Sequence, residues 1–170
     1  MQQSLLWCQR CEHGHLTPVQ ANYPLARMKF YTGSWRGTPR QEKFEIFNLG
    51  MKTGDTLKVK GKISDDSDGF SINLGCRVSD LALHFNPRFN ESVIVCNSRC
   101  SNAWQAEHRD DHFCFSRGST TKIIIEMLAE KFQVKLPDGH TVKFPNRHCY
   151  QTISYMSIRG GFRVTSFKLE

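Results

Sequence analysis

From residue 45 onward the sequence alternates apolar and polar side chains in short runs, and this period of two constrains the fold more than any other feature. In TLKVKGKI (56–63), for example, Leu57, Val59 and Ile63 alternate with three lysines. Such runs predict strands with one buried face, because successive side chains of a strand point to opposite faces. Similar runs lie at 69–75, 81–90, 92–98, 121–128, 132–136, 140–144, 153–158 and 162–169.

Turn signals separate these runs, among them DDSDG (65–69), KLPDGH (135–140) and SIRGGF (157–162). About ten short strands joined by turns are typical of an all-β domain. The best helix candidate, AWQAEHRDD (103–111), is short and polar. We therefore expect residues 45–170 to form a two-sheet antiparallel sandwich, with a closed barrel as the alternative.

Residues 1–44 have a different composition and no sustained periodicity. They hold three of the six prolines and two of the three tryptophans. Their six basic and two acidic residues supply +4 of the formal net charge of +7. TGSWRGTPRQEK (32–43) is typical of a linker. We expect a non-globular N-terminal extension, largely disordered or loosely packed, ahead of the domain.

The bulk composition excludes several classes of protein. No apolar run approaches the roughly 18 residues of a membrane span, and the first residues lack the apolar core of a secretory signal. The seven cysteines are odd in number, and three of them, Cys76, Cys96 and Cys114, lie in strand-like sequence, which favours free thiols and synthesis in the cytosol. Most of the excess of basic residues lies in the extension, so positive and negative charges in the domain are nearly balanced. Nucleic-acid binding is therefore disfavoured.

The run LALHFNPRFN (81–90) places three different polar groups on one face of a strand. Its alternation directs Leu81, Leu83, Phe85, Pro87 and Phe89 to the core. Ala82 and the side chains of His84, Asn86 and Arg88 then face outward, the three polar groups at intervals of about 7 Å. Proline has no backbone N–H to donate, so we expect an interruption of the strand at Pro87.

The next segment extends the same polar face. The connection NES is too short for a crossover, so 92–98 forms a hairpin with 81–90 and turns Asn97 outward. Trp104, Glu107 and Arg109 follow within a short span. A sugar has an apolar face that stacks on an aromatic ring and hydroxyls that both donate and accept hydrogen bonds. Each of these residues alone has an ordinary structural explanation, such as a core tryptophan or a surface ion pair; the combination indicates a sugar site, in which Glu107 would lie between Arg88 and Arg109.

These motifs resemble the carbohydrate-recognition domain of the galectins, with HFNPRF, VIVCNS and W-x-x-E-x-R all filled by the family's residue types. KLPDGHTVKFPNR and the closing SIRGGFRVTSFKLE resemble the prototype group. The resemblance covers residues 45–170 and implies a jelly-roll sandwich with sheets of five and six strands. It implies binding of β-galactosides such as lactose and N-acetyllactosamine on glycoproteins and glycolipids, without a cofactor. The predicted sugar-binding residues are His84, Asn86, Arg88, Asn97, Trp104, Glu107 and Arg109.

The resemblance also implies a role for each residue. His84, Asn86 and Arg88 would contact the axial 4-hydroxyl of galactose, Asn97 and Glu107 the 6-hydroxyl, and Trp104 would stack under the ring. Arg88, Glu107 and Arg109 would reach the neighbouring sugar. Glu107 has no second carboxylate placed for hydrolysis of a glycosidic bond, so we expect a lectin rather than an enzyme.

Prototype galectins pair as two-fold dimers through their terminal strands, here about 45–51 and 162–169. The extension is unusual for that group and would crowd this edge. The resemblance further implies export without a signal peptide and action on cell-surface glycans. In RCSNA (99–103) we expect Cys100 to be an exposed, easily oxidised thiol. The alternative function is a protein- or nucleic-acid-binding module with a vestigial sugar site.

The extension contains one possible metal motif. WCQRCEHGH (7–15) includes a Cys-x-x-Cys pair and two histidines, all residue types that bind zinc. Four ligands within so few residues lack the separation of a zinc module, so we predict no metal. The extension is alternatively an artefact of the assumed start, with Met28 or a later residue as the true beginning. The weak candidate ligands are Cys8, Cys11, His13 and His15.

Overall fold

The structure, a computed structural model, describes residues 27–31 and 42–170. Within these ranges the regular structure is thirteen β-strands, so no helix there is long and apolar enough to cross a bilayer. The strands are β1 (Arg27–Tyr31), β2 (Glu42–Lys52), β3 (Thr56–Ile63), β4 (Phe70–Arg77), β5 (Asp80–Arg88), β6 (Val93–Cys100), β7 (Ala103–Trp104), β8 (His108–Asp110), β9 (Thr120–Met127), β10 (Lys131–Lys135), β11 (Thr141–Pro145), β12 (Thr152–Gly160) and β13 (Phe162–Leu169).

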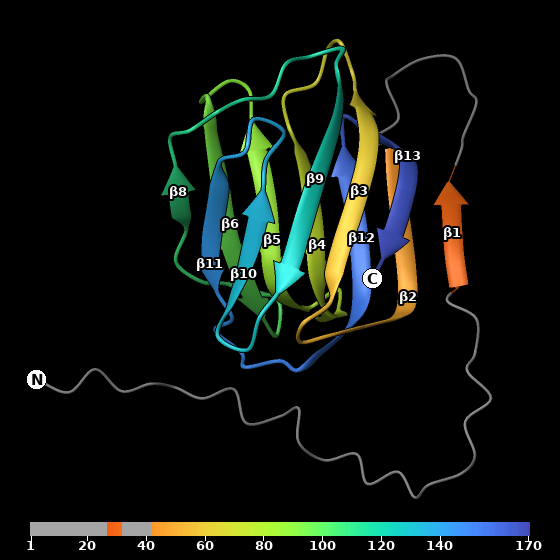
Figure 1. Cartoon of the computed structure of the whole chain (residues 1–170), viewed down its shortest axis with the longest axis vertical. Helices are drawn as coiled ribbons and strands as arrows, with labels where there is room; N and C mark the ends of the chain where they lie inside the picture. The colour runs from red at the N-terminus through yellow and green to blue at the C-terminus, as the bar shows by residue number, and fades with distance from the viewer. Residues whose placement is uncertain (1–26, 32–41) are drawn as a thin grey trace, which may run out of the picture.

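The strands form two antiparallel sheets that face each other, as predicted (Figure 1). One sheet has eight strands in the order β1-β2-β12-β4-β5-β6-β7, with β8 also paired to β6. The other has five strands in the order β11-β10-β9-β3-β13. Strands β7 and β8 pair with opposite ends of β6, because Trp104 lies opposite Arg99 and Asp110 opposite Ile94. The larger sheet therefore has the six expected strand positions and one addition, β1.

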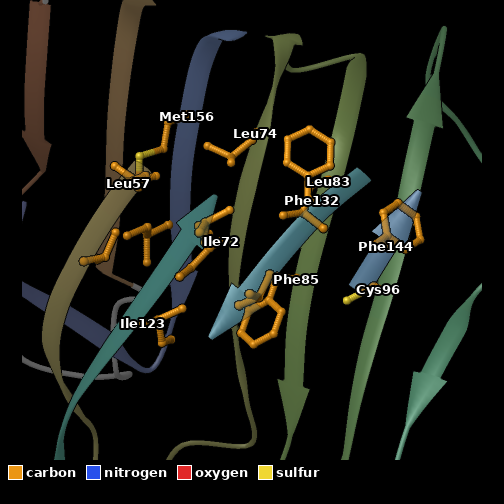
Figure 2. Close-up of a cluster of buried hydrophobic side chains, with 14 of the residues drawn as sticks. Leu57, Ile72, Leu74, Leu83, Phe85, Cys96, Ile123, Phe132, Phe144 and Met156 are labelled. Atoms are coloured by element: carbon orange, nitrogen blue, oxygen red, sulfur yellow. The ribbon is translucent and has the colours of Figure 1, made fainter. Parts of the chain in front are cut away.

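The core lies between the sheets and is filled by both (Figure 2). Phe132 and Phe144 of the five-stranded sheet and Ile72, Phe85 and Met156 of the eight-stranded sheet are almost completely buried. Burying such a side chain stabilises a fold by roughly 1.5–3 kcal/mol. Because alternate residues supply this core, the residues between them are directed to the outer faces of the sheets.

Strand β1 lies within residues 1–44, the segment predicted to be a largely disordered or loosely packed extension. It pairs antiparallel with β2 from Arg27↔Phe47 to Tyr31↔Lys43, and β2 itself begins at Glu42. The outer edge of β2 offers unpaired backbone groups, which a five-residue segment of alternating sequence can satisfy. The rest of the predicted extension, including the candidate ligands Cys8, Cys11, His13 and His15, lies outside the described residues.

The stretch 103–111, the best helix candidate in the sequence, contains β7 and β8 instead. Ser101 and Asn102 both have positive φ, at 48° and 68°, as in the type I′ turn that joins two strands of a tight hairpin. Ser101 N–H donates to Asp80 Oδ1 at 2.8 Å, which anchors the turn. The turn brings Trp104 back beside β6.

Five cysteines in the described residues are free thiols. Cys100, expected to be exposed, is partly buried, and Cys149 is the exposed thiol of this group. The hairpin pairs Cys100 with Ala103 in the ladder of β6 and β7.

Candidate functional site

Strand β5 presents the predicted polar residues on its outer face. His84, Asn86 and Arg88 are half-buried, whereas Phe85 and Pro87 between them are buried. A one-residue bulge corrects the alternation at the start of the strand: Leu81 pairs with Arg99, but His84 pairs with Asn97. Ala82 and Leu83, although adjacent in sequence, accordingly both pack in the core. Ala82 was predicted to face outward and Leu81 inward; Leu81 instead lines a surface pocket with His84.

Pro87 is accommodated by the side chain of Asn86. Continuing the register from Ile72↔Phe85 would place Pro87 opposite Phe70, where proline has no N–H to offer. The Asn86 Nδ2 group donates to the Phe70 carbonyl at 2.6 Å, which satisfies that carbonyl. The same register resumes one residue later at the bridge between Gly69 and Arg88. Asn86 therefore replaces the hydrogen bond that Pro87 cannot donate, and it also belongs to the row of polar residues on the outer face of β5.

His84 is held as a neutral imidazole. Its Nδ1 lies 2.6 Å from Asn73 Oδ1, and the Asn73 Nδ2 group donates to Ser71 and Ser157 hydroxyls. Since Asn73 Oδ1 is an acceptor, Nδ1 carries the proton and Nε2 keeps a free lone pair. Burial, and then the nearby Arg88 charge, lower the pKa of His84 to about 4. At neutral pH the ring thus offers an acceptor to a ligand hydroxyl.

Two arginines and two glutamates alternate in a closed ring, here named the arginine ring. Arg88 donates from Nη1 to Glu91 at 3.0 Å and from Nη2 to Glu107 at 3.1 Å. Arg109 donates from Nη1 to Glu107 at 2.9 Å and from Nη2 to Glu91. Val95, opposite Arg109 in the ladder, is fully buried.

The arginine ring holds both carboxylates ionised and leaves donors free. Hydrogen bonds from Arg109, then Arg88, lower the pKa of Glu91 and of Glu107. Arg88 Nε also donates to Asn86 Oδ1 at 2.9 Å, so three of its five N–H groups are used within the protein. With both pKa values lowered, neither carboxylate is suited to act as the general acid of glycoside hydrolysis at neutral pH.

Trp104 is exposed, as predicted, at 49% of its surface. Its ring lies 4.8 Å from that of His84, centroid to centroid, and the Arg99 guanidinium lies 5.1 Å over it. These neighbours restrict the indole without covering it. An exposed, fixed aromatic ring beside polar groups is suited to stack on the apolar face of a ligand.

Asn97 lies deeper than expected, at 4% exposure. Its Nδ2 donates to the Gln105 carbonyl at 2.9 Å, and its Oδ1 accepts from Ser98 N–H at 2.8 Å and from Arg147 Nη1 at 3.5 Å. One amide hydrogen remains. Asn97 thus ties β6 to the chain after Trp104 and has little capacity left for a ligand.

The site is wider than the seven predicted residues. A pocket of about 90 Å³ extends from His84 and Trp104 across β4 and β12 to Tyr155 and Arg159. Sequence reasoning missed Asn73, Glu91 and Arg99. The alternation of its strand could have identified Asn73, because it places that side chain on the polar face. Glu91 has no such signal, because only the geometry of the hairpin turn brings it to the arginine ring.

A two-sheet β-sandwich with an exposed indole beside a fixed row of polar groups defines a carbohydrate-binding protein. Residues 42–169 match the family model described as galactoside-binding lectin. The chain therefore belongs to the galectin family of β-galactoside-binding lectins.

Comparison with individual proteins agrees with this assignment. Human galectin-2 is 53% identical over 128 residues, covering 75% of this chain and 97% of that protein. The crystal structure of chicken galectin 2 is 68% identical, with a TM-score of 0.74 over 75% of this chain and 98% of that one. CG-16, a homodimeric agglutinin from chicken liver, is 37% identical, with a TM-score of 0.72 over 75% of this chain and 99% of that one. Toad ovary galectin, in a complex with thio-digalactose, is 33% identical, with a TM-score of 0.73 over 75% of this chain and 98% of that one.

Proposed function

We propose that this lectin binds lactose and N-acetyllactosamine-type glycans at the face formed by β5, β6 and the chain from β7 to β8. The observation that carries the proposal is the exposed Trp104 ring beside the neutral His84 and the arginine ring. The complex of toad ovary galectin with thio-digalactose supports a galactoside as the ligand.

The axial 4-hydroxyl of galactose is the group that this face discriminates. His84 Nε2 accepts its proton, while a free N–H group of Arg88 donates to its oxygen. The Asn86 Nδ2 group is used by the Phe70 and Pro87 carbonyls, so Asn86 acts through its Oδ1, which accepts from Arg88 Nε and orients that guanidinium beside the hydroxyl. Glu107 and the last amide hydrogen of Asn97 take the 6-hydroxyl, and Trp104 stacks under the ring. Arg88, Glu107 and Arg109 contact the second sugar. An open site of this kind gives a single-site affinity between about micromolar and millimolar.

The test compares lactose with cellobiose, which differs only in the configuration of that hydroxyl. Titration calorimetry with full-length chain should show lactose binding about 10–100-fold tighter, since the equatorial hydroxyl leaves His84 and Arg88 unpaired. Equal affinities would contradict the proposal. Elution from lactose-agarose by salt but not by lactose would favour the nucleic-acid or protein-binding alternative.

Trp104→Ala separates stacking from stability. Lactose binding should fall below detection because the stacking surface is lost, while the melting temperature stays unchanged because Trp104 is exposed. Trp104→Phe, which keeps a ring, is the matched control and should retain weak binding. A large loss of stability in Trp104→Ala would show that the indole supports the core instead.

Crosslinking of glycans requires two sites in one assembly, and we propose that β1 controls this number. The homodimeric agglutinin CG-16 shows that a similar chain can form a dimer. Here β1 pairs along the edge of β2, the strand that the family resemblance implicates in dimerisation. Pairing of two copies through β2 requires β1 to leave.

Deletion of residues 1–41 tests this control. Sedimentation at matched concentrations should show a monomer for the full chain and a monomer–dimer equilibrium for the truncated chain. Agglutination of lactose-bearing vesicles should increase in parallel. A full chain that is already dimeric, or a truncated chain that stays monomeric, would contradict the role of β1.

We also propose cytosolic synthesis and export that bypasses the secretory pathway. The five free cysteines of the described residues fit folding in a reducing compartment. Expression in cultured cells should give chain in the medium that persists when transport from the endoplasmic reticulum is blocked. Loss of the extracellular chain under that block would contradict this route.

A further inference from the structure

A second polar cluster follows β8 and lies against the turn between β10 and β11, at the edge of the sandwich where the His108 ring of β8 lies 6.4 Å from the Phe144 ring of β11, centroid to centroid (Figure 1). Two Asp-x-His segments build it, Asp110 to His112 and Asp138 to His140. In each, the aspartate Oδ1 accepts from the backbone N–H of its own histidine, at 2.9 Å and 3.1 Å. We name these four residues the Asp-x-His clasp.

The two halves of the Asp-x-His clasp exchange their side chains. His112 Nε2 contacts Asp138 Oδ2, and His140 Nε2 lies 2.9 Å from Asp110 Oδ2. The imidazole rings stack with centroids 4.0 Å apart and planes 17° apart. Each segment is thus oriented by its own turn and by the opposite carboxylate.

Cys114 adds a thiol to this cluster. It lies two residues beyond His112, is partly exposed, and hydrogen-bonds with Asp138. The ligating atoms of His112, Cys114 and Asp138 all lie within 4.8 Å of one another. None of these residues belongs to the proposed sugar site.

We propose that His112, Cys114 and Asp138 bind a Zn²⁺-class cation. A mixed set of imidazole, thiolate and carboxylate suits zinc, whereas Ca²⁺ and Mg²⁺ prefer oxygen ligands alone. Tetrahedral zinc, with bonds of about 2.0–2.3 Å, separates its ligand atoms by about 3.5 Å. The side chains of His112 and Asp138 are about 40% exposed, so they can open their contact to admit the ion.

The rest of the Asp-x-His clasp serves as support for the ion. His140 stacks on the His112 ring, and Asp110 fixes both His140 and the His112 backbone. Binding replaces the thiol proton of Cys114 with the metal and releases that proton to water. Three protein ligands leave the fourth position to water or to an outside ligand.

Cobalt(II) is the probe, because its bond to a thiolate gives a charge-transfer absorption in the near ultraviolet. The reduced full-length chain with Cys8→Ser and Cys11→Ser is titrated, so that the N-terminal thiols cannot contribute. The band should appear in this background, vanish on adding Cys114→Ser, and require at least tenfold more cobalt in Asp138→Asn. Cys149→Ser, which removes an exposed thiol elsewhere, is the matched control and should keep the band.

Lactose binding by each variant checks that the fold is intact. Absence of the band in the background chain would overturn the proposal, as would a band that survives Cys114→Ser in a chain that still binds lactose. Asp138→Asn preserves the shape of the side chain, so a cobalt affinity equal to that of the background would exclude Asp138 as a ligand.

Discussion

The arginine ring and the Asp-x-His clasp each combine two carboxylates with two nitrogen-containing side chains, arginines in the ring and histidines in the clasp. The two clusters meet at β8, where neighbouring residues belong to one and to the other. Arg109 closes the arginine ring, and Asp110 anchors the clasp. Successive strand residues point to opposite faces, so the ring lies on the outer face of the larger sheet and the clasp turns toward the β10–β11 turn.

The two clusters differ in whether their side chains, apart from the carboxylates, can offer a lone pair to a ligand. A guanidinium is always protonated and only donates, so the arginine ring offers N–H groups and fixed carboxylates to hydroxyls. An imidazole and a thiol can lose a proton and expose a lone pair, which is what a metal ion needs. Two clusters with a similar arrangement of carboxylates and nitrogen-containing side chains are therefore suited to two different kinds of ligand, a sugar and a metal ion.

The largest effect should come from a crossed pair of variants. Arg88→Ala should abolish lactose binding, because it removes donors to both sugars and opens the arginine ring, while cobalt binding is retained. Asp138→Asn should weaken cobalt binding and leave lactose binding intact. Calorimetry and cobalt absorption on both variants make the test; loss of both ligands in either variant would break the separation of the clusters.

The buried histidine of the sugar site should have a pH signature of its own. With a pKa of about 4 in the folded chain against 6.5 unfolded, the unfolded state binds the extra proton between these values. Stability should therefore be complete above pH 6.5 and fall by about 3 kcal/mol as the pH drops to 4. Denaturant unfolding of wild type and His84→Gln checks this; an equal decline in both would refute the assignment.

His140→Asn should have a smaller effect, confined to the metal. Loss of the stacked ring loosens His112, and we expect cobalt affinity to fall about tenfold. The charge-transfer band itself should persist, since His140 is not a ligand. Disappearance of the band would place His140 among the ligands, and an unchanged affinity would remove it from the support.

Glu91→Gln should have the smallest effect. Glu91 and Glu107 both contact the same arginines, but these contacts are exposed and Glu107 remains to orient the guanidiniums. Lactose affinity should fall by no more than about fivefold, and less in high salt, where exposed charges are screened. A loss as large as that of Arg88→Ala would show that Glu91 contacts the sugar itself.

The sequence was sufficient for the sandwich because alternation and turn residues are local signals. The boundaries of β3 and β13, predicted at 56–63 and 162–169, match the structure. The bulge between Leu81 and His84 was not predictable, because it depends on the register of two strands. The burial of Asn97 depends likewise on Arg147, which lies 50 residues further along the chain. Contacts made by distant segments have no local signature.

Strand β1 has a consequence for solubility as well. The eleven-residue β2 would be a long template for the sheets of other molecules, and open edges of this kind promote fibre growth. With β1 in place, the larger sheet ends instead in a strand of five residues. A short terminal strand limits the number of intermolecular backbone hydrogen bonds that can form, and so protects a concentrated solution of this chain from aggregation.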